Sequence, residues 1–252
     1  MSADVSGTPV LLLHGSGPGT TAAAWDPLVA ALAPRHQAIA PDLLGFGSSQ
    51  RPVGSLRAAW TRQALGLVDS LGVTSFAVVG NSAGAAIALS IAAARPRAVT
   101  HVVAVGAMGH AMALPAGLDA LWAYGSPTLD RARALIELIN FDPAAATPEA
   151  VATRYRATLA QPWYPELFPP PRQRWVDDLA LARAELEGIA APVLLVHGAQ
   201  DRVVPLHDSF LPLLEALPDA RGHVFGRCGH AAPLEHTVEF NQLITTFLET
   251  DR

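Results

Sequence analysis

The sequence predicts an α/β fold in which helices cover both faces of a mostly parallel sheet. The chain has 252 residues, of which 50% are hydrophobic, so it can bury one large core. Short apolar runs alternate along it with longer helical patterns, as in successive βα units. At residues 78–86, VVGNSAGAA, a β-branched run passes through a glycine-flanked turn directly into an alanine-rich stretch. These observations together favour a βα-type chain over an all-helical one.

Six apolar runs are the predicted strands. They are VLLLHG from Val10, QAIAPDL from Gln37, FAVVGN from Phe76, VTHVVAVG from Val99, VLLVHG from Val193 and the shorter GHVFG from Gly222. Between the third and fourth runs, AGAAIALSIAAARP is rich in strong helix formers, and Pro96 ends it. We therefore expect a helix directly after the third strand.

The alternation stops between residues 108 and 191. This stretch holds several prolines and several helical patterns, but no convincing strand. We expect residues 1–107 and 192–252 to form an α/β core, and residues 108–191 to form a helical lid over one end of the sheet.

One helix start is readable within that stretch. Thr147, Pro148 and Glu149 match an N-cap, a proline at the first helical position and an early acidic residue. The helix that they begin carries an apolar stripe, with Arg154 on its flank.

Charge and cysteine content exclude several functions. The net charge is −5 with a pI near 6.0, and the charges are scattered, so we expect no binding to nucleic acid or to an anionic membrane. The N-terminus lacks a signal-peptide pattern and no apolar run could span a bilayer, which predicts a cytoplasmic protein. Cys228 is the only cysteine and no H-E-x-x-H spacing occurs, so we expect no disulfide, no metal and no cofactor.

The turn at residues 80–84 has the pattern of a serine nucleophile. Gly80-Asn81-Ser82-Ala83-Gly84 matches G-x-S-x-G between a strand and a helix, which is the context that this motif requires. A strained turn there lifts the Ser82 hydroxyl off the end of the sheet, and the glycines let the strand and the helix pass closely. Ser82 is therefore the predicted nucleophile.

A serine hydroxyl needs a base, and the base needs an orienting acid. Asp201 follows VLLVHGAQ, on the loop after a late strand, and His230 lies in GRCGHAAPLEH, after the last short strand. The order serine, acid, histidine is that of α/β-hydrolases. Among the nine histidines, His14 and His197 look structural, and His110 is the alternative that could line a pocket.

The glycine-rich stretch HGSGPGTTAAAW follows the first predicted strand, where the loop on the oxyanion side belongs. We expect the backbone N–H groups of Ser16 and Ala83 to form the oxyanion hole, with Gly15 and Gly17 allowing close approach to the substrate. A phosphate-binding loop is the rival interpretation. The stretch has no G-x-G-x-x-G pattern, and the chain has no lysine.

With these residues in view, the chain resembles the α/β-hydrolases over essentially its whole length. More narrowly it is similar to the meta-cleavage product hydrolases, which cleave carbon–carbon bonds in ring-cleavage products, and in particular to the 2-hydroxymuconic semialdehyde hydrolase type. The resemblance rests on LLLHGSGPG, GNSAGAAIAL, PPPRQRWVDDL, HGAQDRVVPL and HVFGRCGH. It implies a small-molecule substrate whose carboxylate binds Arg154 and whose oxo or hydroxyl end contacts Asn81. It also implies a possible homodimer.

Three departures from that family concern the pocket and the sheet. Members usually carry a tryptophan after the catalytic histidine, where this chain has Ala231, and an asparagine where this chain reads TTAAAWDP. They also begin with an antiparallel hairpin, for which nine residues before the first strand leave no room. The first two departures change the pocket, and the third would leave a sheet edge free.

These residues support a serine-dependent hydrolase acting on a 2-hydroxy-6-oxo-hexa-2,4-dienoate-type compound. Hydrolysis of an ester, thioester or lactone by the same triad is an alternative, because a fold does not decide which bond is cleaved. A non-catalytic protein that binds a small ligand is an alternative of another class. Residues of the lid are expected to surround the group beyond the ketone, although Leu and Trp at such positions are core residues as often as pocket walls. The candidates are Met108, Leu114, Leu121, Trp122, Leu138 and Trp163.

Overall fold

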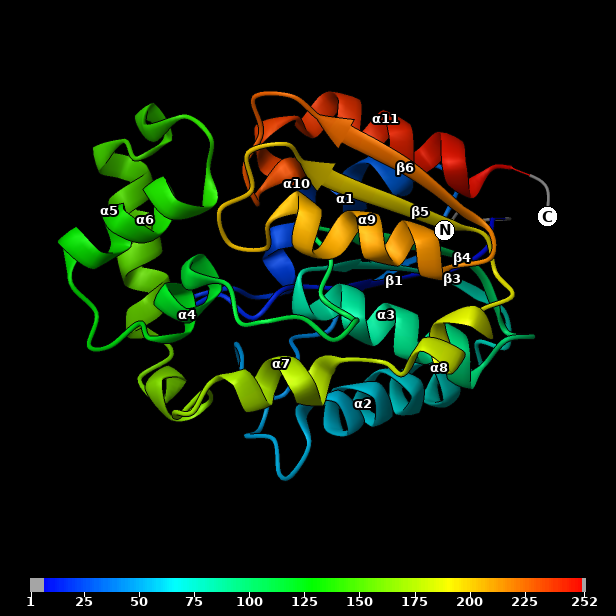
Figure 1. Cartoon of the computed structure of the whole chain (residues 1–252). Coiled ribbons are helices and arrows are strands. Elements are labelled where there is room, and N and C mark those ends of the chain that lie inside the picture. Colours follow the sequence, from blue (N-terminus) through cyan, green and yellow to red (C-terminus); the bar gives the residue numbers. More distant parts are fainter. Residues whose placement is uncertain (1–6, 251–252) are drawn as a thin grey trace.

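A computed structural model describes residues 7–250 and contains one six-stranded sheet in which every neighbouring pair is parallel (Figure 1). The strand order is β2-β1-β3-β4-β5-β6. The strands are β1 Val10–Leu13, β2 Ala38–Ile39, β3 Phe76–Asn81, β4 Val99–Val105, β5 Val193–Gly198 and β6 Ala220–Phe225. All six predicted strands are confirmed.

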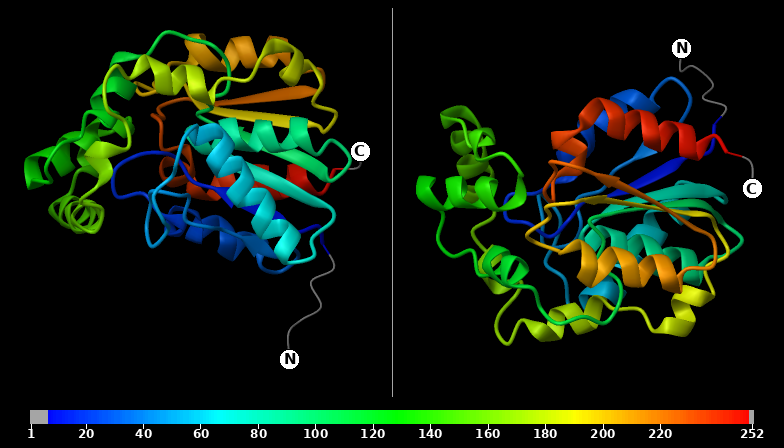
Figure 2. Two further views of the ribbon diagram at one scale, coloured as in Figure 1. Left: turned by 90° about the horizontal axis from the view of Figure 1, so that it is seen from below. Right: turned by 45° about the horizontal axis from the view of Figure 1, so that its top comes forward.

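Helices cover both faces of this sheet, as predicted (Figures 1 and 2). One face carries α2 Leu56–Ser70, α3 Ala83–Ala94 and α9 Leu206–Ala216, and the other carries α1 Asp26–Leu32 and α11 Thr237–Leu248. Alternate residues of β1 belong to the two cores: Leu11 lies in one and Leu12 in the other. The strands read as apolar throughout because both of their faces are buried.

Residues 108–191 contain helices and no strand. The helices are α4 Ala116–Trp122, α5 Leu129–Ile139, α6 Pro148–Leu159, α7 Gln173–Leu179 and α8 Arg183–Glu187, with 3₁₀ turns at Pro143–Ala145 and Tyr164–Glu166. Figure 1 shows α4, α5 and α6 beyond one end of the sheet, whereas α7 and α8 run along α2 and α3. The predicted helix start is confirmed, because the Thr147 side chain accepts from the N–H of Ala150 at 3.1 Å.

The helices α5 and α6 pack against each other through a small core of their own. It consists of Ala132, Ile136, Ala146 and Val151, separate from the two cores of the sheet. Leu135 of α5 also belongs to one of the two cores of the sheet, and Leu138 and Ile139 pack against that core, so the C-terminal half of α5 joins the pair to the rest of the molecule.

The edge of the sheet relates to the expected lack of an N-terminal hairpin. Among residues 7–250 the sheet has no antiparallel strand, and the short β2 forms one edge. The expected lack of an N-terminal hairpin also concerns residues 1–6, which lie outside the described residues.

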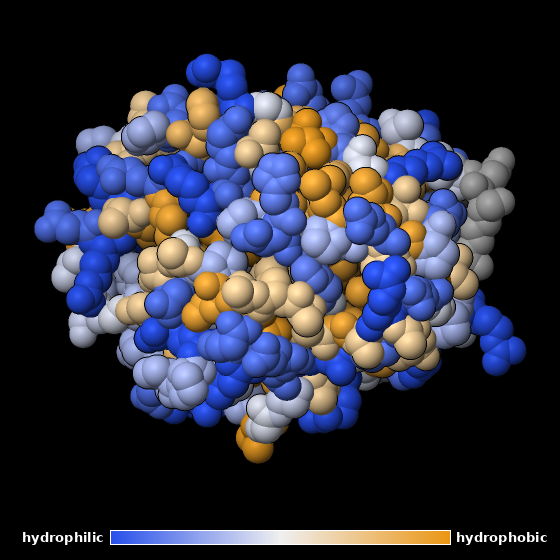
Figure 3. Space-filling model, in the orientation of Figure 1, coloured by the Kyte–Doolittle hydropathy of each residue, from blue (hydrophilic) through white to orange (hydrophobic). Residues whose placement is uncertain are grey.

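Within the described range, no helix combines the length and hydrophobicity needed to cross a membrane. On the face shown in Figure 3, hydrophobic side chains reach the surface in separate groups among hydrophilic ones.

Two glycines let α3 begin directly against the strands. A Cβ on Gly80 would lie 2.2 Å from the carbonyl oxygen of Gly84, and a Cβ on Gly84 would lie 2.3 Å from that of Leu13. Both obstacles are backbone atoms, so neither can move aside. Only glycine allows this close contact between the helix start and the sheet.

We predict that Gly84→Ala destabilises the protein by roughly 3 kcal/mol or more, because its Cβ would overlap the backbone of β1. Thermal and urea denaturation measure the loss. Gly66→Ala is the matched control, because Gly66 lies on exposed α2 with nothing within 4 Å of the added Cβ. Equal stability of the two variants would contradict the packing described here.

Candidate active site

Ser82 occupies a strained turn between β3 and α3. Its φ of 56° and ψ of −119° lie outside the regions that most residues adopt. Its N–H donates to the carbonyl of Val105 at 2.8 Å, and its carbonyl accepts from Ala85 at 3.0 Å and from Met108 at 3.2 Å. These bonds hold the strained conformation, and such strain is typical of functional positions. Ser82 is thus placed as the nucleophile motif predicts.

The predicted acid and base contact each other. Asp201 follows β5, and His230 lies between β6 and the short helix α10 Ala232–Glu235. The two are joined by a hydrogen bond of 2.7 Å between Nδ1 of His230 and Oδ2 of Asp201. The other carboxylate oxygen accepts from the N–H groups of Val203 and Val204 at 2.8 and 2.9 Å. A carboxylate in this position keeps the proton on Nδ1 and leaves Nε2 free to act as a base.

Asp201 is held in its charged form. Burial would raise the pKa of this carboxyl, but interactions led by the charge and hydrogen bond of His230, with the N–H of Val204, outweigh it and lower the pKa. Asp201 therefore remains a carboxylate at neutral pH and can stabilise a protonated imidazole.

Two other buried histidines have structural roles, as the sequence indicated. His197 donates from Nε2 to the carbonyl of Val204 at 2.8 Å, and burial lowers its pKa, so it supports the Asp201 turn as a neutral ring. In His14, Nδ1 donates to the carbonyl of Gly15 at 2.8 Å and Nε2 accepts from the N–H of Leu43 at 3.0 Å. Burial also lowers the pKa of His14. His14 thereby fixes the start of the glycine-rich loop.

The end of β4 brings Ser82 close to the acid and base. Val105 accepts the Ser82 N–H, and a Cβ on the next residue, Gly106, would lie 3.0 Å from the His230 ring and 3.4 Å from Asp201. Among the described residues, no hydrogen bond joins the Ser82 hydroxyl to His230. Such bonds are often long before a ligand binds and tighten in the complex. The three predicted residues therefore converge at one edge of the sheet, with Asp201 and His230 already bonded.

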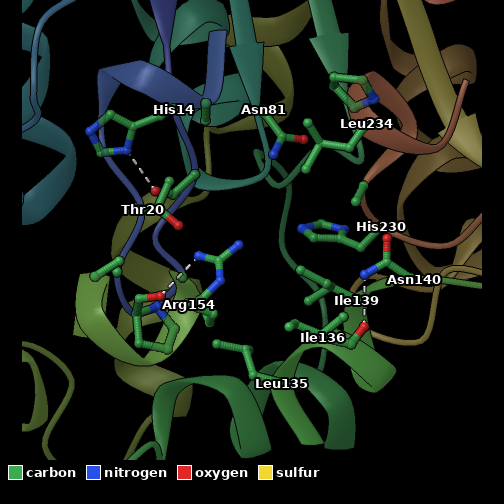
Figure 4. A pocket seen from close by; sticks show the side chains of 18 of the residues that line it. His14, Thr20, Asn81, Leu135, Ile136, Ile139, Asn140, Arg154, His230 and Leu234 are labelled. Atoms are coloured by element: carbon green, nitrogen blue, oxygen red, sulfur yellow. Dashed lines mark hydrogen bonds between the residues drawn. The ribbon is translucent and has the colours of Figure 1, made fainter. Parts of the chain in front are cut away.

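A cavity of about 700 Å³ opens at this edge (Figure 4). Ser82 and His230 line it, and both are buried. The other predicted site residues in its wall are Gly15, Ser16, Gly17, Asn81 and Arg154, and Ala231 also lines it. Asp201 and Ala83 are buried beside His230 and Ser82. The volume is typical of a site for a small organic ligand.

Arg154 extends from α6 into the cavity. Figure 4 shows its guanidinium on one side and His230 on the other, with Ile136 and Ile139 next to His230. Nη1 donates to the carbonyl of Pro18 at 3.2 Å. Burial lowers the pKa of Arg154 and Tyr124 partly opposes this, but a guanidinium remains protonated at neutral pH. The cavity thus has a cation facing the predicted base.

The predicted oxyanion loop is rigidly held. The Ser16 hydroxyl accepts from Nε1 of Trp122 at 2.9 Å, and the Ser16 carbonyl accepts from the Tyr164 hydroxyl at 2.9 Å. Ala83 is the first residue of α3, where backbone N–H groups have no partner within the helix. Asn81 also lines the cavity, and its Oδ1 is buried without a hydrogen-bond partner among the described residues. A polar ligand could satisfy that oxygen.

Comparison with known proteins agrees with this geometry. A family model described as "alpha/beta hydrolase fold" matches residues 8–237. The chain belongs to the α/β-hydrolase fold family. Within it, the chain belongs to the meta-cleavage product hydrolases, on the evidence of its relatives.

Several relatives cover nearly the whole chain. It is 39% identical over 250 residues to a 2-hydroxymuconate semialdehyde hydrolase of Pseudomonas sp. strain CF600, covering 96% of this chain and 87% of that protein. It is 38% identical to a 2-hydroxy-6-oxo-2,4-heptadienoate hydrolase of Pseudomonas putida, covering 98% and 91%. The crystal structure of a meta-cleavage product hydrolase of Pseudomonas fluorescens IP01, a serine-to-alanine mutant with acetates, has a TM-score of 0.91 at 37% identity, covering 96% and 90%.

The cavity wall differs from the one expected from the sequence. Of the six apolar candidates, Leu121 lines the cavity. The others do not: Trp122 stacks on Phe168 with 4.6 Å between ring centroids, and Trp163 donates to the carbonyl of Gly45. Trp122 is buried in the large core, whereas Trp163 is partly buried near Arg51, outside the cavity. His110, the alternative pocket histidine, instead donates to the carbonyl of Asp208 at 2.7 Å.

Helix α5 supplies the wall that the sequence analysis missed. Leu135, Ile136 and Ile139 line the cavity, and Asn140 follows them. Their spacing indicates an amphipathic helix, and α5 has that pattern. The pattern identifies an apolar face but does not show whether that face meets a core or a cavity.

We predict that the stability contributed by Asp201 depends on pH. The folded state lowers the pKa of Asp201 below the unfolded value of about 3.9, so the ionised carboxylate stabilises the fold above about pH 4. This stabilisation is lost as the pH falls toward the folded value. Urea denaturation should show wild type more stable than Asp201→Asn at pH 7, with a difference that shrinks below pH 4.

Asp208→Asn is the control for the loss of one negative charge, since Asp208 is exposed on α9. A difference between wild type and Asp201→Asn that is the same at pH 7 and at pH 3.5 would contradict the assignment of a stabilising buried carboxylate.

Proposed function

We propose that this chain hydrolyses a carbon–carbon bond in a 2-hydroxy-6-oxo-hexa-2,4-dienoate-type ring-cleavage product, with Ser82, His230 and Asp201 as its triad. One observation carries the proposal. A single cavity holds the Arg154 guanidinium on one side and the His230–Asp201 pair on the other. A substrate with a carboxylate at one end and a reactive ketone further along fits that separation. The relatives named above are hydrolases of such dienoates by name.

Arg154 and Asn81 would seat the substrate. The planar fork of Arg154 suits a carboxylate, and its one contact with the Pro18 carbonyl leaves other N–H groups free to bind. Asn81 adjoins Ser82, so its amide would hold the 2-oxo or 2-hydroxyl oxygen near the reacting carbons. This arrangement aligns the dienoate along the cavity from Arg154 toward His230.

The chemistry begins with tautomerisation. A proton moves from the 2-hydroxyl group to carbon 5, which gives a 2,6-diketone whose conjugated 2-oxo end can accept electrons. His230 then takes a proton from Ser82 or from a water, and the resulting oxygen nucleophile adds to carbon 6. The N–H groups of Ser16 and Ala83 stabilise the oxyanion, and loss of one such donor would raise the barrier by about 3 kcal/mol.

Cleavage then transfers electrons toward the 2-oxo end. The bond between carbons 5 and 6 breaks, its electron pair enters the conjugated system, and a proton completes the 2-hydroxydienoate product. Addition of one water in total releases the other fragment as a carboxylic acid. The imidazolium of His230, stabilised by Asp201, supplies the proton.

The proposal extends to the organisation of the chain. Residues 108–191 would act as the lid, with α4, α5 and α6 covering the cavity and α7 and α8 anchoring the segment to the core. The enzyme would work in the cytoplasm on a small molecule, as a possible homodimer.

An esterase, thioesterase or lactonase activity is the second candidate. Ala231 is a small side chain beside His230, and the neighbouring Leu234 is 52% exposed at the cavity. The cavity is therefore wide next to the base, which would admit ester substrates of varied shape.

Side-by-side assays separate the two candidates. We predict that the protein bleaches yellow ring-cleavage dienoates, and that Arg154→Gln lowers kcat/KM for the dienoate by about 100-fold while changing turnover of a neutral nitrophenyl ester less than about threefold. The reason is that only the dienoate carries a carboxylate for Arg154.

Arg156→Gln is the matched control, because Arg156 is exposed on the same helix and does not line the cavity. It should behave as wild type with both substrates. Rapid ester turnover without dienoate bleaching would replace the carbon–carbon assignment with the second candidate.

A further inference from the structure

We infer that Glu235 and Arg202, here called the brace, are positioning residues that tie the end of α5 to the loops carrying Asp201 and His230. The inference rests on the proposed Ser82–His230 pair, but not on the bond that is cleaved. Both residues bind the same short segment, residues 137–141, Arg202 from the loop after β5 and Glu235 from the end of α10.

Glu235 accepts from three donors, of which two lie in the His230 loop and one lies just past α5. Its Oε1 accepts from the N–H of Gly229 at 2.8 Å and from the Cys228 thiol at 3.7 Å. Its Oε2 accepts from the N–H of Phe141, just past α5, at 2.6 Å. One carboxylate thus bonds both the residue before His230 and the segment that follows the cavity wall.

The Cys228 thiol acts as a donor in this cluster. Burial, followed by the charge of Glu235, raises the pKa of Cys228 well above its ordinary range. The thiol therefore stays protonated, and its one proton lies within reach of both the Gly229 carbonyl at 3.5 Å and Glu235 at 3.7 Å. This accounts for the chain's single cysteine without giving it a reactive role.

Arg202 joins the same segment to the loop that carries Asp201. The Asp201 carboxylate points toward His230, while the next side chain, Arg202, donates from Nη2 to the carbonyls of Glu137 and Asn140, the latter at 2.6 Å. These carbonyls lie at the C-terminal end of α5, where a cation is favourable.

The backbone of the His230 loop also touches this segment directly. The N–H groups of His230 and Ala231 donate to the carbonyl of Ile139 at 2.7 and 3.2 Å. A Cβ on Gly229 would lie 2.6 Å from the same carbonyl oxygen, so the two segments are in close contact. Since Ile139 and Asn140 line the cavity, the base and part of the substrate wall are held at a fixed spacing.

The brace explains how the α5–α6 pair, which has a small core of its own, stays in a fixed position relative to the triad. Arg154 lies on α6, outside the brace, so substrate binding through its carboxylate does not depend on Glu235. Without Glu235 the His230 loop and α5 stay joined by the bonds to Ile139 and by Arg202, but the loop can shift, and displacements of about 1 Å at a base cost up to about 100-fold in rate. The expected defect is in the chemical step more than in binding.

The test is the rate constant for phosphonylation of Ser82 by a fluorophosphonate, measured with kcat, KM and thermal midpoint for any substrate turned over. We expect Glu235→Ala to react at least about tenfold more slowly than wild type, and Glu235→Gln, which keeps one acceptor oxygen, to lie between them. KM should change less than about threefold in both. Glu239→Gln, an exposed acid four residues further on, should match wild type.

Different results would overturn the brace, the proposed substrate or the triad. If Glu235→Ala and Glu235→Gln are folded at the assay temperature and react within about twofold of wild type, the brace is wrong. If Glu235→Ala is unfolded there, the rate and kcat of Glu235→Gln decide. A wild type that reacts with the phosphonate but bleaches no dienoate overturns the proposed substrate and leaves this inference intact. A wild type that does not react at all overturns the triad and the brace together.

Discussion

The close contact between the start of α3 and strands β1 and β3 is the constraint on which the site depends. Gly80 and Gly84 allow the helix to begin within van der Waals range of strand backbone, and this forces Ser82 into its strained turn. The turn places Ser82 in the wall of the cavity. The contact between α3 and the strands thus determines the position of the Ser82 hydroxyl, around which the proposed site lies.

The parallel sheet brings the proposed acid and base to the same edge as Ser82. Because the carboxyl ends of all strands lie at one edge, the loops after β3, β5 and β6 meet there, although Ser82, Asp201 and His230 are far apart in the chain. Local contacts determine the protonation state of each group. Asp201 stays ionised because of its N–H and imidazole partners, and the buried His197 stays neutral. Arg154, on helix α6 beyond the sheet, adds a cation to the cavity. The cavity thus has a guanidinium on one side and the His230–Asp201 pair on the other.

Local patterns in the sequence predict the strands, the strained turn at Ser82 and the neighbouring positions of Asp201 and His230, all of which the structure contains, while the catalytic roles of these residues stay predictions. Each of these depends on a short run of residues whose physical requirement is specific, such as glycine where a helix starts against a strand. The cavity wall on α5 and the roles of Glu235 and Arg202 were not predictable in this way. They depend on which face of an amphipathic helix meets the triad loops, and on backbone contacts between segments about 60 to 90 residues apart. Trp122 and Trp163 show the same limit, since large apolar residues suit a core and a pocket equally well.

The most direct measurement of the central claim is peptide mapping of the fluorophosphonate adduct by mass spectrometry, with its rate of formation in wild type and in His230→Gln. The account predicts one adduct, on the peptide that contains Ser82, forming on the order of 10³-fold more slowly or worse without the imidazole. An adduct on another residue, or equal rates in the two proteins, would contradict the claim that Ser82 is a nucleophile activated by His230.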